Sequence, residues 1–154
     1  MTKRFFLAAL TAAFLLAPQS GWAQACAPKG SEAQIPILLQ AFFDGLARDD
    51  RRVWSQIIDR SFYAYDANQR LDGNALFEML EKAHHTGIRI VWHLDEINVQ
   101  ADCATAWFSQ MNNGSVGDAG GSQPMSWQES GVFTWRDGQW KLSFFHSNRV
   151  QPKS

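Results

Sequence analysis

The chain has 154 residues with 14 basic and 15 acidic side chains, which gives a formal net charge of −1 at pH 7. This balance suggests no basic face, so nucleic-acid binding lacks its electrostatic footprint, and anionic membrane surfaces are disfavoured for the same reason. The length suits one domain with a single hydrophobic core.

The beginning of the chain has the pattern of an export signal. Lys3 and Arg4 precede an apolar run over residues 5–17, which is too short for a permanent membrane anchor. Ala23 and Ala25 supply the small residues of a cleavage site after Ala25. A buried N-terminal helix is the alternative.

Cleavage at this point would separate a signal peptide, residues 1–25, from one mature domain, residues 26–154, in the periplasm or outside the cell. Without Lys3 and Arg4, 12 basic residues remain against 15 acidic ones, a net charge of −3. Cys26 would become the first residue, which raises a lipoprotein as a further alternative.

Two cysteines, Cys26 and Cys103, remain in the mature chain. Export would place them where disulfides persist, and a bridge would attach the N-terminus to a distant part of the chain. The bridged and the free states both stay open from the sequence. Metal binding by two cysteines so far apart is the less favoured reading.

Three helices are expected in the first half. Apolar residues recur at helical spacing over residues 31–48, and a short second helix, capped by Asp49 or Asp50, carries apolar residues at 53–58. The third helix begins at Asp72 or Asn74 and ends at Gly87.

One strand is predicted between the second and third helices. Residues 61–65 are dominated by aromatic side chains, and a turn at residues 66–68 follows. Residues 70–71 then pair back with this strand.

The second half predicts strands over residues 88–100, 103–111, 127–135 and 139–149. Asp137-Gly138 is a strong hairpin signal between the last two. The glycine-rich stretch over residues 112–126 is expected to be a long disordered loop, with a lid over a binding site as the alternative. Helices followed by an antiparallel meander indicate an α+β domain with helices on one face of a curved sheet, and with a hollow between the layers.

The run from Gly131 to Arg149 resembles the ending of SnoaL-like proteins. These belong to the NTF2-like superfamily, with the ketosteroid isomerases and the association domain of calmodulin-dependent kinase. The positions that carry the resemblance are Trp135, Asp137-Gly138, Trp140, Lys141, Leu142, Phe144, His146 and Ser147. Phe42-Phe43 in the first helix and Trp54 in the second agree with it, so that it covers residues 35–149.

The resemblance implies an α+β NTF2-like cone, with three N-terminal helices packed on a curved, mostly antiparallel sheet. It also implies pairing of two copies through the open sheet face, with Phe145 and Trp107 as contacts in a homodimer. Ketosteroid isomerases use an Asp base together with Tyr and protonated Asp donors. Tyr63, Tyr65 and Asp66 lie in a plausible strand, whereas the second acid would have to be Glu129 or Asp95.

The last strand supplies the first candidate for chemistry. Strict alternation places Trp140, Leu142, Phe144 and His146 on one face, toward the hollow. His146 could then act as a general acid or base, because histidine titrates near neutral pH. The alternative is a structural histidine that is tied to a backbone carbonyl or a hydroxyl group.

Glu129 is the second candidate, because alternation places it on one face with Trp127, Gly131, Phe133 and Trp135. If this face is buried, desolvation raises the pKa of Glu129, which could then accept a proton near neutral pH. If the face is solvated, Glu129 is an ordinary surface charge.

His93 and Asp95 share a strand face and could join His146 in a metal site, although a solvated face is favoured and no metal is predicted. No nucleophile elbow, phosphate loop or dinucleotide fingerprint occurs, and no cofactor is expected.

The leading hypothesis is an exported protein that binds a small apolar molecule in its cone. Tyr65, Trp107, Trp140 and Phe144 are the predicted ligand contacts. If the protein is an enzyme, the reaction would be isomerisation, dehydration or cyclisation, with His146 and Glu129 as acid and base and Tyr63 as polar donor. The alternative is a non-catalytic accessory or toxin-neutralising domain that binds a protein through its outer sheet face.

Overall fold

The computed structural model describes residues 26–150, so the predicted signal peptide lies outside the described residues. The elements follow in the order α1 (Gln34–Ala47), α2 (Arg51–Ile57), β1 (Ile58–Asp66), β2 (Gln69–Asp72), α3 (Gly73–His85), β3 (Arg89–Asp102), β4 (Thr105–Asp118), β5 (Gly121–Arg136) and β6 (Gln139–Arg149). Over this part of the chain, no helix is long and apolar enough to cross a membrane.

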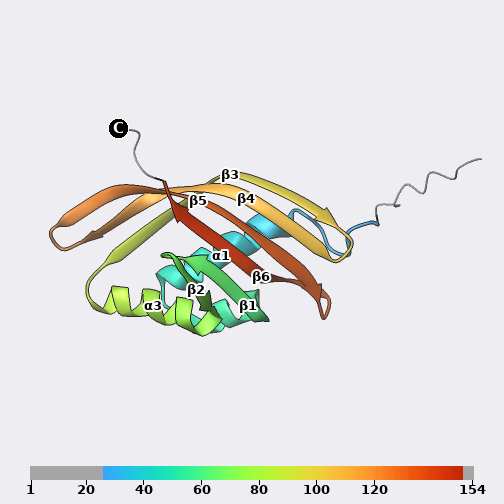
Figure 1. Ribbon diagram of the computed structural model, residues 1–154, viewed down its shortest axis with the longest axis horizontal. Coiled ribbons are helices and arrows are strands. Elements are labelled where there is room, and N and C mark those ends of the chain that lie inside the picture. Colours follow the sequence, from blue (N-terminus) through green and yellow to red (C-terminus); the bar gives the residue numbers. More distant parts are fainter. Residues whose placement is uncertain (1–25, 151–154) are drawn as a thin grey trace, which may run out of the picture.

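The strands form one six-stranded sheet in the order β2-β1-β6-β5-β4-β3. Strands β1 and β6 run parallel, and every other pair is antiparallel. The long strands β3, β4 and β5 arch over the helices, which lie together on one side of the sheet (Figure 1). The predicted α+β class, with helices on one face of a mostly antiparallel sheet, is confirmed.

Aspartates begin two of the helices, as expected from their preference for the N-cap position. The Asp50 carboxylate accepts hydrogen bonds from the backbone N–H groups of Arg52 and Val53, and Asp72 accepts one from Ala75. The assignment of Ile58 to the second helix was wrong. Its backbone is extended, because it already pairs with Leu142 of β6.

Two-residue turns close the two shortest hairpins. Ala67 and Asn68 join β1 to β2, and Asp137 and Gly138 join β5 to β6, all four with positive φ. This geometry matches the twist of paired strands and explains why Asp-Gly was a reliable signal.

The predicted loop over residues 112–126 was wrong. Strand β4 continues to Asp118 and β5 begins at Gly121, with backbone pairing maintained up to the turn. Gly114 and Gly117 reflect close backbone packing, since a Cβ on Gly114 would lie 1.8 Å from the carbonyl oxygen of Val91 and one on Gly117 would lie 2.4 Å from that of Gly121. Many side chains of residues 112–126 are exposed. The alternation of buried and exposed residues that marks a half-buried strand is therefore weak in this segment.

Two β-bulges change which side chains face the helices. An extra residue in β3, at Glu96 with φ of 52°, turns Ile97 toward the core rather than to the face of His93. In β6, Val132 pairs with Phe144 and Phe133 with Leu142, which leaves Ser143 as the extra residue. Beyond Ser143 the alternation of β6 is therefore reversed.

An aromatic core joins the helices to the sheet. The ring of Phe42 lies 4.8 Å from Trp54 and 5.3 Å from Phe145, and that of Phe43 lies 5.5 Å from Trp92, measured between centroids. These side chains come from α1, α2, β3 and β6, so the core fixes the helical layer against the middle of the sheet.

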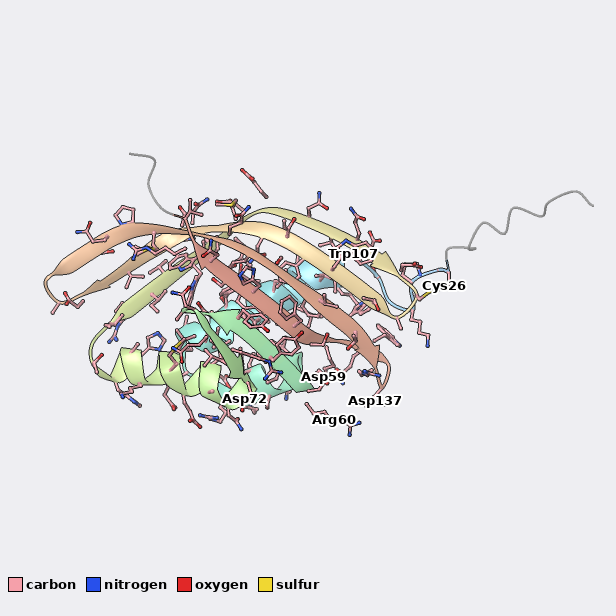
Figure 2. All side chains as sticks on the ribbon, in the orientation of Figure 1. Cys26, Asp59, Arg60, Asp72, Trp107 and Asp137 are labelled. Carbon is pink, nitrogen blue, oxygen red and sulfur yellow. A yellow bond between two sulfur atoms is a disulfide. The ribbon has the colours of Figure 1, made fainter. Side chains whose placement is uncertain are left out.

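A disulfide joins Cys26 to Cys103 at the β3–β4 turn, so the bridged alternative is confirmed (Figure 2). The Lys29 N–H donates to the carbonyl of Cys103 over 2.7 Å. Gly30 packs directly against Trp135 and Trp140, where a Cβ would not fit. The segment before α1 is thus fastened to one end of the sheet.

Candidate functional site

A cavity of about 180 Å³ lies between the helices and the inner face of the sheet. A hollow of about 150 Å³ suffices for a benzene-sized molecule. Most of its lining is apolar: Phe43, Leu46, Leu76, Met79, Leu80, Ile90, Trp92, Trp127 and Phe145. The polar side chains that line it are Asp66, Glu129 and Ser147.

Glu129 projects from β5 into this cavity and is only 3% exposed. One carboxylate oxygen, Oε2, accepts hydrogen bonds from Gln110 Nε2 at 2.7 Å and from Asn112 Nδ2 at 3.2 Å. The other oxygen accepts from the Ser147 hydroxyl at 3.3 Å. Neighbouring strands on both sides therefore hold the carboxyl group in one orientation.

Burial raises the pKa of Glu129 to about 7, because desolvation penalises the charged form. The three hydrogen bonds oppose this rise, since they stabilise the carboxylate, and the nearby Asp66 adds to it by repulsion. Near neutral pH, Glu129 therefore exchanges between the acid and the carboxylate.

Asp66 ends β1 and brings a second carboxyl group to the same cavity. Burial raises its pKa, while the N–H of Ala67 at 2.7 Å and the nearby His146 act in the opposite direction. Asp66 also lines an open cleft of about 620 Å³ beside the β1–β2 turn. It can thus exchange protons with solvent, whereas Glu129 is enclosed.

The cavity contains no lysine, arginine or histidine among the described side chains that line it. Two carboxyl groups in one apolar site without a counter-ion resist simultaneous ionisation, so each favours the neutral form of the other. Such a pair can hold one acid and one base at the same pH.

Gln110 and Asn112 form a polar layer behind Glu129, and both are almost fully buried. Their amide nitrogens bind the carboxylate, while Gln110 Oε1 and Asn112 Oδ1 have no hydrogen-bond partner within residues 26–150. Burial of an amide oxygen without a hydrogen-bond partner costs folding free energy, so such groups call for an explanation. Positioning of a functional carboxyl group by the two amide nitrogens is one.

Among the predicted site residues, Glu129 lies on the inner face together with Trp127, as alternation predicts. The predicted inward orientation of His146 and Phe144 was wrong. His146 is exposed and Phe144 packs on the outer face, because the bulge at Ser143 reverses the alternation of β6.

The remaining aromatic candidates also lie away from the cavity lining. Tyr63 and Tyr65 pack against Phe144 on the outer face, with ring centroids 5.1 and 6.2 Å from it. Trp107 is exposed, and Trp140 is buried against Trp135 in the core. None of these candidate side chains contributes to the described wall of the cavity.

Two further placements differ from expectation. Phe145 was predicted as a contact between copies, but it is buried in the core and lines the cavity. His93 and Asp95 lie on β3, with β4 and β5 between them and His146 on β6. At roughly 5 Å per strand, these side chains do not converge on one metal ion.

The resemblance to the ketosteroid isomerases pointed to Asp66 beside Tyr63 and Tyr65, but the predicted catalytic residues did not include it. Gln110, Asn112 and Trp92 were not predicted as site residues. Asp66 had a usable signal, since it is an acid at the end of an aromatic strand just before a turn. The two amides had none, because their positions opposite Glu129 depend on the register of β4 and β5.

The chain matches the model of the SnoaL-like domain over residues 38–148. This region is most of the chain and contains both carboxyl groups and the whole cavity lining. The protein therefore has the NTF2-like fold and belongs to the SnoaL-like domain family.

Solved structures share this fold at low sequence identity. An NTF2-like protein from Cytophaga hutchinsonii is 8% identical with a TM-score of 0.66, over 79% of this chain and 99% of that one. The CaMKII hub of S. rosetta is 16% identical with a TM-score of 0.67, over 80% and 100%. A proposed dehydratase of the NTF2-like family from Streptomyces avermitilis is 16% identical with a TM-score of 0.67, over 79% and 96%.

No curated protein matches the chain at a significant level.

Proposed function

We propose that this SnoaL-like protein binds a small, largely apolar molecule in the hollow of a cone-shaped fold and catalyses proton transfer on it. The observation that carries the proposal is the Glu129–Asp66 pair in one apolar cavity. A hydrophobic core with only a structural role would not contain two carboxyl groups here, because burying them without counter-ions is costly. The proposed dehydratase with the same fold agrees with this class of chemistry.

The two acids have different roles in this mechanism. The ionised carboxylate removes a proton from a carbon of the substrate, and the protonated partner donates its proton to an oxygen. Donation to a carbonyl oxygen followed by return of the proton to another carbon gives isomerisation, whereas donation to a departing hydroxyl group gives water and an alkene. Asp66 exchanges protons with solvent through the cleft, which restores the protonation state of the pair after each turnover. Glu129 acts on the part of the substrate that lies in the enclosed cavity.

A benzisoxazole ring tests for such a base without knowledge of the natural substrate, because its opening requires removal of one carbon-bound proton. We expect turnover above the buffer rate, with an apparent pKa near 7 in the pH profile, as burial of Glu129 implies. Glu129→Gln and Asp66→Asn should each lose at least about tenfold of it.

Glu78→Gln on the exposed side of α3 is the matched control and should keep full activity. Turnover that is unchanged in both the Glu129 and the Asp66 variants would overturn the catalytic proposal. Mass spectrometry of protein purified from its own host would then establish whether the cavity retains a ligand.

We propose a periplasmic or secreted location, with cleavage after Ala25. The disulfide supports an oxidising compartment, and the bridged Cys26 would be the first mature residue. The mass of the intact protein from its native host tests this directly. A mass that includes residues 1–25 would contradict cleavage, and an added lipid mass would contradict the bridge as well, because lipidation uses the Cys26 sulfur that the disulfide occupies.

We also propose that two copies pair through the outer sheet face. Trp107, Val132, Phe144 and Tyr63 lie opposite one another across four strands, and Trp107 is 43% exposed. An apolar row of this kind is typical of contact surfaces. The CaMKII hub of S. rosetta, which has the same fold, agrees with assembly.

Trp107→Glu should convert the dimer to a monomer in analytical ultracentrifugation, since it replaces the most exposed ring of the row by a charge. Gln56→Glu, an exposed position on α2 in the helical layer on the other side of the sheet, is the control and should leave the dimer intact. A wild-type protein that is monomeric at micromolar concentration would overturn this proposal and favour a partner of another kind.

A further inference from the structure

Arg149 lines the open cleft that adjoins the cavity, although alternation in the sequence alone placed it on the outer face. Beyond the bulge, Phe145, Ser147 and Arg149 project from the inner face of β6. Arg149 pairs directly with Trp127 of β5, and Ser147 pairs with Glu129. Directly paired residues share a face, so Arg149 continues the column that leads outward from Glu129.

The sheet has a notch beside Arg149. Strand β1 ends at Asp66 after Tyr65 has paired with His146, whereas β6 continues to Arg149. The edge of β6 that faces β1 therefore has no strand partner beyond His146 within residues 26–150. The cleft of about 620 Å³ occupies this notch.

The notch and the cavity are neighbours, because Asp66 and Ser147 line both. One molecule could therefore lie with its apolar part against Trp127 and Phe145 and its polar end in the notch. The cavity alone, about 180 Å³, accommodates little more than a single ring, so a larger substrate needs the second space.

Charge distinguishes the two spaces. The cavity has two carboxyl groups and no cation among its described lining, whereas the notch contains the Arg149 guanidinium and His146. Arg149 makes no ion pair and no side-chain hydrogen bond within the described chain. A guanidinium group binds a carboxylate in a fixed fork geometry. The Asp66 carboxyl is the acidic group that also borders the notch.

We propose that the substrate is a small apolar acid, whose ring or chain occupies the cavity and whose carboxylate binds Arg149 in the notch. This inference rests on the proposed function and adds the substrate class to it. Arg149 is then a specificity-determining residue: it holds the acidic end outside, so that the apolar end reaches Glu129 and Asp66.

Two near-isosteric probes test the proposal. Phenylacetate carries the acid, and phenylacetamide is its neutral counterpart of similar shape. We expect calorimetry or NMR titration of the oxidised protein to give about five- to tenfold tighter binding of phenylacetate, a range typical of a charge-assisted hydrogen bond at a partly solvated site. The preference should weaken with added salt.

Arg149→Gln should remove the preference and leave phenylacetamide binding unchanged, and Arg149→Lys should restore part of it. Arg136→Gln, an exposed arginine at the other end of β5, is the matched control and should keep the preference. Both positions are exposed, so folding should not be affected.

Equal affinity of the wild type for both probes, or a preference that survives in Arg149→Gln, would overturn the anion site and leave the cavity proposal standing. Failure of both probes to bind would overturn the cavity and the anion site together. Binding of both probes without benzisoxazole turnover would overturn the catalytic proposal alone.

Discussion

The Glu129 carboxyl accepts three hydrogen bonds from neutral donors, and no positively charged side chain is among them. Hydrogen bonds of this kind favour the carboxylate, yet its pKa still rises to about 7. Burial to 3% exposure is therefore the dominant effect. A carboxyl group whose pKa is raised in the folded state makes the folding stability depend on pH.

Unfolding returns Glu129 to water and to its ordinary pKa of 4.5, so the folded state binds the proton more tightly. The stability gained from this protonated form is complete below pH 4.5 and is lost as the pH rises toward 7. We expect the free energy of unfolding to fall by about 2–3 kcal/mol across this window.

Urea denaturation at about pH 5 and about pH 8 measures the effect. Glu129→Gln should lose most of this pH dependence, because the amide stays neutral and can keep the same partners. Glu78→Gln should retain it. A wild-type stability that rises over the same interval would contradict the assigned environment of Glu129.

Gln110 should influence the pKa of Glu129. Gln110→Met keeps the shape of the side chain but removes the N–H donor at 2.7 Å, so the pKa of Glu129 should rise above 7. The ionised protein should lose about 1–3 kcal/mol of stability. Carbon-13 NMR titration of the glutamate carboxyls measures the shift, with Gln100→Met on the exposed face of β3 as control. An unchanged titration would exclude a positioning role for Gln110.

At the residue scale, the sequence identified Glu129 because an acid among aromatic residues on one strand face is unusual. Alternation placed His146 on the wrong face, because it is counted residue by residue and Ser143 adds one residue to β6. A bulge leaves no reliable mark in a single sequence, so every side chain beyond it was misplaced.

At the scale of elements, the arm formed by β3, β4 and β5 depends on close backbone contact at its glycines. Gly114→Ala should destabilise the protein by about 2 kcal/mol, because the added Cβ would lie 1.8 Å from the Val91 oxygen. Hydrogen exchange should show faster opening at the outer end of the arm.

Gly45→Ala in α1 is a suitable control for this substitution. The nearest side-chain atom to its added Cβ belongs to Val53, at 3.4 Å, and alanine favours a helix. The free energy of unfolding of the Gly45→Ala variant should be nearly that of the wild type. Equal losses in both variants would show that crowding at Gly114 is not the cause.

The helix caps at Asp50 and Asp72 and the Asp137-Gly138 turn were predictable, because short-range hydrogen bonds and backbone preferences determine them. The extended arm was not. Its strands are stabilised by backbone pairing with neighbours up to the turn at residues 119–120. Few of its side chains are buried, so the sequence lacks the apolar alternation that would indicate this pairing.

At the scale of the whole molecule, the Cys26–Cys103 disulfide joins positions separated by 77 residues. Constraint of so long a loop in the unfolded chain should contribute about 4.5 kcal/mol. Reduction of the mature protein should lower its free energy of unfolding by this amount. A double Cys26→Ser/Cys103→Ser variant should show the lower stability with and without reductant. A wild type that reductant leaves unchanged would contradict a stabilising bridge.

The sequence by itself determined the α+β class, most of the elements, the family and one of the two acids. The class, the elements and the acid follow from local periodicity, turn chemistry and residue type, which act over a few positions along the chain, whereas the family follows from the resemblance of residues 131–149. Only the tertiary structure brought Asp66 to Glu129, placed Gln110 and Asn112 behind it, and turned Arg149 toward the open cleft that adjoins the cavity. The physical reason is register: strands far apart in sequence meet at positions set by bulges and by packing against the helices, and one residue of shift exchanges the two faces of a sheet.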